Sequence, residues 1–163
     1  MKRFELLPGI RFNTAKIADP AAFARERQAA SWLYLVGEEF ASMEGGMSWA
    51  QVQDAVGHSI NVISDPPRVL DLALARAHVA ALDELPRPTL VTCRSGPRSS
   101  AVAYMYSGLR SGADPREVVE EAERNGALFC QFEEYKEWVR HSIDELRREQ
   151  GDAPGVVVPP ESR

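Results

Sequence analysis

The residues best able to do chemistry lie in a short segment near the middle of the chain. An apolar run over residues 89–92 ends at Cys93, small and basic residues follow at 94–100, and a helix-forming stretch begins at 101. A strand, a tight turn and a helix N-terminus in this order gather several backbone N–H groups around one anion. The same positive field favours the ionised, nucleophilic form of a cysteine at the start of the turn. The segment therefore predicts an anion-binding loop with a reactive thiol.

Each side chain of this loop has a predicted role around a tetrahedral oxyanion. Arg98 presents a planar, always-charged fork that can hold two oxygens of the anion. Ser99 could donate its hydroxyl to the sulfur of Cys93 and stabilise the thiolate. The residues between cysteine and arginine form the predicted anion-binding loop: Arg94, at the loop rim, Ser95, Gly96, which accepts unusual backbone dihedrals, and Pro97. These parts suit attack by sulfur on phosphorus or on a sulfane sulfur.

Length and composition limit what the whole chain can be. With 163 residues, of which 44% are hydrophobic, the chain is long enough for one compact domain with a core. We expect this domain over residues 1–150 and a loose tail over 151–163, where proline, glycine and polar residues prevail. The formal net charge of −5 argues against nucleic acid or an anionic membrane surface as the partner.

Other sequence features bear on location and cofactors. Residues 1–20 lack the long apolar core of a signal peptide, and no run approaches the roughly 20 apolar residues of a membrane span. Two cysteines, Cys93 and Cys130, are too few for a disulfide framework, so a cytoplasmic location is the simplest expectation. His58 and His78 lack partners at metal-ligand spacing, and we expect no metal or other cofactor.

Strand and helix signals alternate along the chain. Strands are expected within residues 4–12 and at 31–36, 59–63 and 89–92, and helices at 20–28, 48–56, after 66–67, from 115 and over 132–146. This pattern predicts an α/β domain with a small, largely parallel sheet of four or five strands, flanked by helices on both faces. Ligands of such sheets bind beyond the carboxyl ends of the strands, which is where the Cys93 loop must lie.

The loop Cys93-Arg94-Ser95-Gly96-Pro97-Arg98-Ser99 resembles the signature loop of the cysteine-dependent protein phosphatases and the rhodaneses. It is most similar to the phosphatase-like domain of the beta-lactamase-hydrolase-like proteins, whose loop reads Cys-Arg-Ser/Thr-Gly-x-Arg-Ser. The Leu7-Pro8-Gly9-Ile10 segment and the strands that follow it occur in the order that dual-specificity-like phosphatases use. The resemblance, over about residues 5–110, implies a protein tyrosine phosphatase-like fold and hydrolysis of a phosphate monoester through a thiophosphate on Cys93.

Two departures from that pattern leave the transferred group open. Four residues separate Cys93 from Arg98, whereas ordinary tyrosine and dual-specificity phosphatases have five, and Thr92 stands where those enzymes have a histidine. The four-residue spacing is also that of the rhodaneses. A sulfurtransferase carrying a persulfide on Cys93 is therefore the alternative, and an inactive anion-binding or redox-sensing module is a third hypothesis. Each predicts a small anionic or phosphorylated ligand, and the oligomeric state stays open.

A general acid is the remaining requirement of phosphate-ester cleavage, because the leaving oxygen needs a proton. The resemblance places an aspartate after a strand, about 30 positions before the cysteine, and Asp65 matches this place. Asp65 also precedes two prolines, so it could merely cap the following helix. Asp71 is a weaker second candidate. Cys130 could resolve an oxidised Cys93, although a buried structural cysteine is the simpler expectation.

Overall fold

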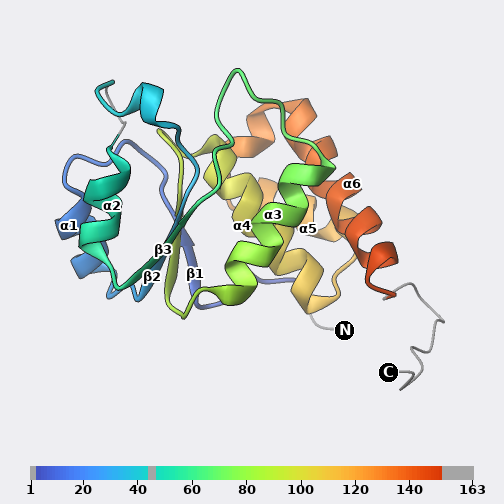
Figure 1. Cartoon of the computed structure of the whole chain (residues 1–163). Helices are drawn as coiled ribbons and strands as arrows, with labels where there is room; N and C mark the ends of the chain where they lie inside the picture. Colours follow the sequence, from blue (N-terminus) through green and yellow to red (C-terminus); the bar gives the residue numbers. More distant parts are fainter. Residues whose placement is uncertain (1–2, 44–46, 152–163) are drawn as a thin grey trace.

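The computed structural model describes residues 3–43 and 47–151 of the chain, and within them a parallel sheet forms the centre (Figure 1). Its strands are β1 (Ile10–Phe12), β2 (Ser31–Tyr34), β3 (His58–Asn61) and β4 (Thr89–Thr92), in the order β1-β4-β2-β3. All neighbouring pairs are parallel. The predicted small parallel α/β sheet is thus confirmed.

The burial of each strand explains its sequence. Every residue of β2 and β4 is buried, as expected for central strands covered on both faces, and this is why both read as nearly continuous apolar runs. β3 lies at the edge of the sheet and is only partly buried. The strands end slightly earlier than predicted: β2 stops at Tyr34 rather than at 36, and β3 stops at Asn61 rather than at 63.

Helices cover both faces of the sheet, as predicted (Figure 1). On one face, α1 (Pro20–Glu26) and α2 (Trp49–Ala55) pack against a cluster around Trp32 and Tyr34. On the other face lie α3 (Leu72–Glu84), α4 (Pro97–Ser111), α5 (Pro115–Arg124) and α6 (Glu133–Glu149). Two short 3-10 turns, η1 (Glu38–Phe40) and η2 (Leu128–Gln131), complete the connections. Of the tail expected over residues 151–163, residues 152–163 lie outside the described residues.

The helix starts follow capping chemistry. Asp19 accepts a hydrogen bond from the amide of Ala22, Ser48 forms a capping box at α2, and Asp114 caps α5, so these helices begin at or next to the residues predicted for them. The helix expected directly after Pro66-Pro67 begins later, at Leu72, because Asp71 accepts from the amide of Leu74 at 2.9 Å and caps it. The alternative role of Asp65 as a helix cap is therefore wrong.

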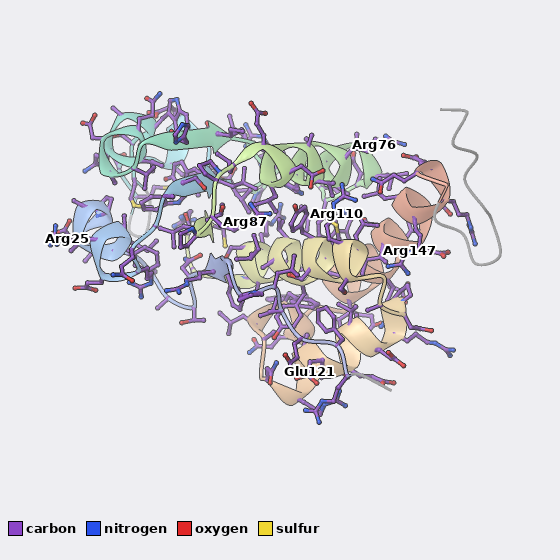
Figure 2. All side chains as sticks on the ribbon, turned by 90° about the horizontal axis from the view of Figure 1, so that it is seen from below. Arg25, Arg76, Arg87, Arg110, Glu121 and Arg147 are labelled. Atoms are coloured by element: carbon purple, nitrogen blue, oxygen red, sulfur yellow. The ribbon has the colours of Figure 1, made fainter. Side chains whose placement is uncertain are left out.

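Helix α4 carries the Cys93 loop at its N-terminus and lies in the middle of the larger core. Its residues from Ser99 to Leu109 are buried. Two arginines from other parts of the fold hold its C-terminal half, and Figure 2 labels both. Arg87 donates to the hydroxyl of Tyr106 at 2.8 Å, and Arg147 donates to the carbonyl of Gly108 at 3.0 Å. These contacts fix the helix whose first turn forms the anion loop.

A buried histidine gives the fold a predicted pH dependence. His78 on α3 is fully buried, its Nε2 lies 2.8 Å from the Ser64 hydroxyl, and burial lowers its pKa to about 3. Below the unfolded pKa of about 6.5, the unfolded chain binds a proton that the folded chain does not. We expect the free energy of unfolding to fall by up to about 1.4 kcal/mol per pH unit from pH 6.5 towards pH 3.

Urea unfolding of the protein and of His78→Gln, each measured from pH 7 to pH 4, tests this expectation. The variant removes the titrating group, so its stability should fall less steeply with acid than that of the parent protein, whatever its stability at pH 7. Equal slopes would mean that other groups account for the whole acid dependence.

No helix in the described part of the chain is long and apolar enough to cross a membrane. The same residues hold no group of three or more His, Cys, Asp or Glu side chains that could bind a metal ion.

Candidate active site

The sulfur of Cys93 lies at the centre of the turn between β4 and α4. The amide of Gly96 donates to it at 3.1 Å and the amide of Ser99 at 3.3 Å. Both donors belong to the beginning of α4, a helix of 15 residues whose N-terminal dipole adds positive potential at the same point. Two converging N–H groups and a helix N-terminus therefore place positive electrostatic potential at the sulfur.

Gly96 makes this turn possible. Its φ of +121° lies in a region that residues with a side chain rarely adopt. A Cβ at this position would also lie 2.7 Å from Cδ1 of Leu128 and 2.8 Å from the backbone oxygen of Asn13. The loop therefore needs a glycine both for its dihedral angle and for space.

Gly96→Ala is expected to lower the free energy of unfolding by about 1–3 kcal/mol, the usual cost of a strained backbone. Thermal unfolding measures this loss. Gly57→Ala serves as the matched control, because a Cβ at Gly57 meets no atom within 4 Å. A Gly96→Ala protein as stable as the Gly57→Ala protein would contradict the tight turn described above.

Asn13 is a site residue that the sequence reasoning missed. It follows β1 directly, is 2% exposed, and ties the turn to the neighbouring strand. Its Nδ2 donates to the carbonyl of Cys93 at 2.9 Å, and its Oδ1 accepts from the amide of Cys93 at 3.1 Å. The available signal was its position, since a polar residue at the carboxyl end of a parallel strand faces the ligand side of the sheet.

Ser99 lies close to the sulfur, and its hydroxyl contacts two groups. Its Oγ is 3.5 Å from Sγ of Cys93 and 2.7 Å from Oδ1 of Asn13. The shorter contact shows that the hydroxyl donates to Asn13 here, while the Ser99 amide bonds the sulfur. Donation from the hydroxyl to an ionised sulfur would need only a rotation about the Ser99 Cβ–Oγ bond.

Arg98 extends from the first turn of α4 and joins three parts of the site. Its Nη1 donates to the carbonyls of Ser64 and Arg68, the latter at 3.0 Å, and its Nε donates to the hydroxyl of Tyr135 at 3.0 Å. The predicted two-point grip on an anion is thus partly replaced by contacts within the protein. If these contacts stay intact, Nη2 is the nitrogen of Arg98 from which an anion would accept a hydrogen bond.

A cavity of about 180 Å³ opens above the turn. It brings together most of the predicted site residues, from the loop after β3, the Cys93 loop and α6. Its lining consists of Asp65, Pro66, Cys93, Arg94, Ser95, Pro97, Arg98 and Tyr135. Gly96 and Ser99 support the loop without lining the cavity, and Asp71 and Cys130 lie outside the lining. The guanidinium carbon of Arg94 lies 5.6 Å from the ring centroid of Phe40.

Asp65 is held in a partly desolvated place beside this cavity. It is 3% exposed, its Oδ1 accepts from the amide of Gly37 at 3.3 Å, and Nη1 of Arg68 lies 3.2 Å from the same oxygen. Burial raises the pKa of Asp65 and outweighs the opposing effects of the Gly37 amide and the Arg68 charge. The carboxyl therefore keeps its proton to a higher pH than an ordinary aspartate, as a proton donor requires.

Cys130 lies in a different environment from Cys93. It is half-buried in η2, and burial together with the nearby Glu123 raises its pKa to about 11. A thiol with so high a pKa is almost entirely protonated at neutral pH and is a poor nucleophile. This supports the simpler expectation of a structural cysteine.

No family model matches the chain, and no curated protein matches it in sequence. Solved structures do match. TpbA from P. aeruginosa is 20% identical, with a TM-score of 0.57 over 85% of each chain. Tk-PTP in its active form is 14% identical, with a TM-score of 0.63 over 83% of this chain and 91% of its own. The core catalytic domain of the PP-IP phosphatase SIW14 from S. cerevisiae is 14% identical, with a TM-score of 0.56 over 92% and 93%. Over most of its length, the chain therefore has the protein tyrosine phosphatase-like fold of these structures.

Proposed function

We propose that the protein is a phosphatase-like hydrolase that cleaves a phosphate monoester through a thiophosphate intermediate on Cys93. One observation supports this proposal above all. A sulfur that accepts two backbone N–H groups lines the same cavity as a buried aspartate with a raised pKa. A nucleophile and a proton donor in one small cavity are the two groups that ester cleavage requires.

In the first step, the Cys93 thiolate attacks phosphorus, so that a P–S bond forms and the P–O bond to the leaving group breaks. Asp65 gives its proton to the departing oxygen. The backbone N–H groups of the loop stabilise the charge that develops on the phosphoryl oxygens. In the second step, water attacks phosphorus while Asp65 takes up a proton, the P–S bond breaks, and the thiolate and inorganic phosphate are released.

The structural neighbours agree with a small anionic ligand. A structure of TpbA holds pTyr, and the structure of SIW14 holds citrate. The volume of the cavity, about 180 Å³, is suited to a phosphoryl group and part of its ester rather than to a large ligand. Transfer of sulfur from thiosulfate needs no proton donor, so the place of Asp65 favours the phosphatase over the sulfurtransferase.

Two assays on the purified protein test the proposal. One supplies p-nitrophenyl phosphate and measures release of p-nitrophenol, and the other supplies thiosulfate and cyanide and measures thiocyanate. We expect the first product and not the second. Thiocyanate formation would show that the protein is a sulfurtransferase. If neither product forms, both enzyme hypotheses are wrong, and the inactive anion-binding module is the hypothesis that agrees with the result.

A further inference from the structure

Tyr135 reaches the candidate site from α6, far along the chain from the loop that it contacts. Its hydroxyl oxygen accepts the hydrogen bond from Nε of Arg98 at 3.0 Å, and the guanidinium carbon lies 5.4 Å from its ring centroid. The ring also packs against Phe132, with 5.2 Å between ring centroids. Tyr135 lines the cavity together with Cys93 and Arg98.

The hydrogen bonds of Arg98 show what Tyr135 could supply. A guanidinium has five N–H groups, and its Nε and Nη2 groups lie on one edge. Nη1 is engaged by the carbonyls of Ser64 and Arg68, and Nε is engaged by Tyr135. An anion oxygen at Nη2 would therefore lie beside the Tyr135 hydroxyl, on the same edge of the fork.

The hydroxyl of Tyr135 has one hydrogen of its own to donate. It accepts from Arg98, and among the described residues no acceptor lies within hydrogen-bond distance of it. A hydroxyl that accepts from a cation becomes a stronger donor, because hydrogen bonds in a chain polarise one another. The hydrogen bond from Arg98 therefore makes the Tyr135 hydroxyl a stronger donor to a ligand oxygen.

We propose that Tyr135 is a substrate-binding residue, whose hydroxyl donates a hydrogen bond to a phosphoryl oxygen while it still accepts from Nε of Arg98. It supplies the second donor that Arg98 no longer offers directly. This inference rests on the proposed function in one respect, namely that the cavity holds a phosphoryl group. It needs no rearrangement of Arg98 or of the Ser64 and Arg68 carbonyls.

Calorimetric titration with inorganic phosphate tests this role. Tyr135→Phe keeps the ring over Arg98 and removes only the hydroxyl, so we expect about tenfold weaker phosphate binding and a similarly raised KM for p-nitrophenyl phosphate. Tyr104→Phe is the control, because the Tyr104 hydroxyl bonds Asn125 and lies outside the cavity lining. That variant should bind phosphate as the parent protein does.

The outcomes separate this inference from the proposed function. If Tyr135→Phe binds phosphate as tightly as the parent, or more tightly, the hydroxyl is not a donor to the anion. Tighter binding would show instead that Tyr135 competes with the anion for Arg98. If the parent protein binds phosphate and hydrolyses the ester, the proposed function survives either result. If the parent neither binds phosphate nor turns over the ester, the proposed function is wrong, and the role of Tyr135 that depends on it is wrong as well.

Discussion

Replacement of Cys93 by serine is expected to abolish hydrolysis of p-nitrophenyl phosphate, with kcat reduced by at least about 10⁴-fold. A serine hydroxyl is a much weaker nucleophile than a cysteine sulfur, so the two N–H groups that hold Sγ would face an oxygen that attacks phosphorus poorly. The same variant should still bind inorganic phosphate, because the loop amides come from the backbone. Steady-state kinetics and calorimetric titration measure the two effects.

Cys130→Ser is the matched control for this variant. Cys130 lies outside the cavity lining and has a raised pKa, so its replacement should leave kcat unchanged. Residual activity of Cys93→Ser close to that of the parent protein would rule out the thiophosphate route. A loss of activity in both variants, with intact folding, would instead point to a redox partnership between the two thiols.

The sheet and most of the helix starts were predictable because each depends on local chemistry. Residues 31–34 and 89–92 form apolar runs that only a strand buried on both faces explains, and both are central strands. Asp19 and Asp114 each precede a proline, which is a strong signal for a helix start. The Cys93 loop was predictable for the same reason, since its residue types and spacing are contiguous in sequence.

The rest of the site depends on contacts between distant segments, which no local pattern contains. Asn13 lies 80 residues from Cys93 in sequence, and Tyr135 lies 37 residues from Arg98. The partners of Arg98 were unpredictable because the arginine contacts the backbone of the loop after β3, where residue type carries no signal. The late start of α3 was also not predictable from a local pattern. Residues 66–71 lie outside the helix, and Arg68 among them forms an ion pair with Asp65.

Replacement of Asp65 by asparagine is expected to lower kcat by about 10²–10⁴-fold for alkyl phosphate esters, whose leaving oxygen needs a proton. The loss should be much smaller for p-nitrophenyl phosphate, because p-nitrophenolate leaves without help. The pH profile should change as well. Burial raises the pKa of Asp65, so the active, protonated acid persists to a higher pH than in an ordinary aspartate, and activity falls as the pH rises through that pKa. Asparagine does not titrate, so this basic limb should disappear.

Asp71→Asn is the control, because Asp71 caps α3 outside the cavity and asparagine is an equally good cap. It should keep both the leaving-group dependence and the basic limb. Arg68→Gln gives a third readout, since the Arg68 charge lowers the pKa of Asp65 and its removal should move the basic limb to higher pH. If Asp65→Asn retains the parent's basic limb and its activity on alkyl esters, the proton comes from another group. A shift of that limb in Arg68→Gln, together with its loss in Asp65→Asn, would assign the titration to the buried carboxyl itself.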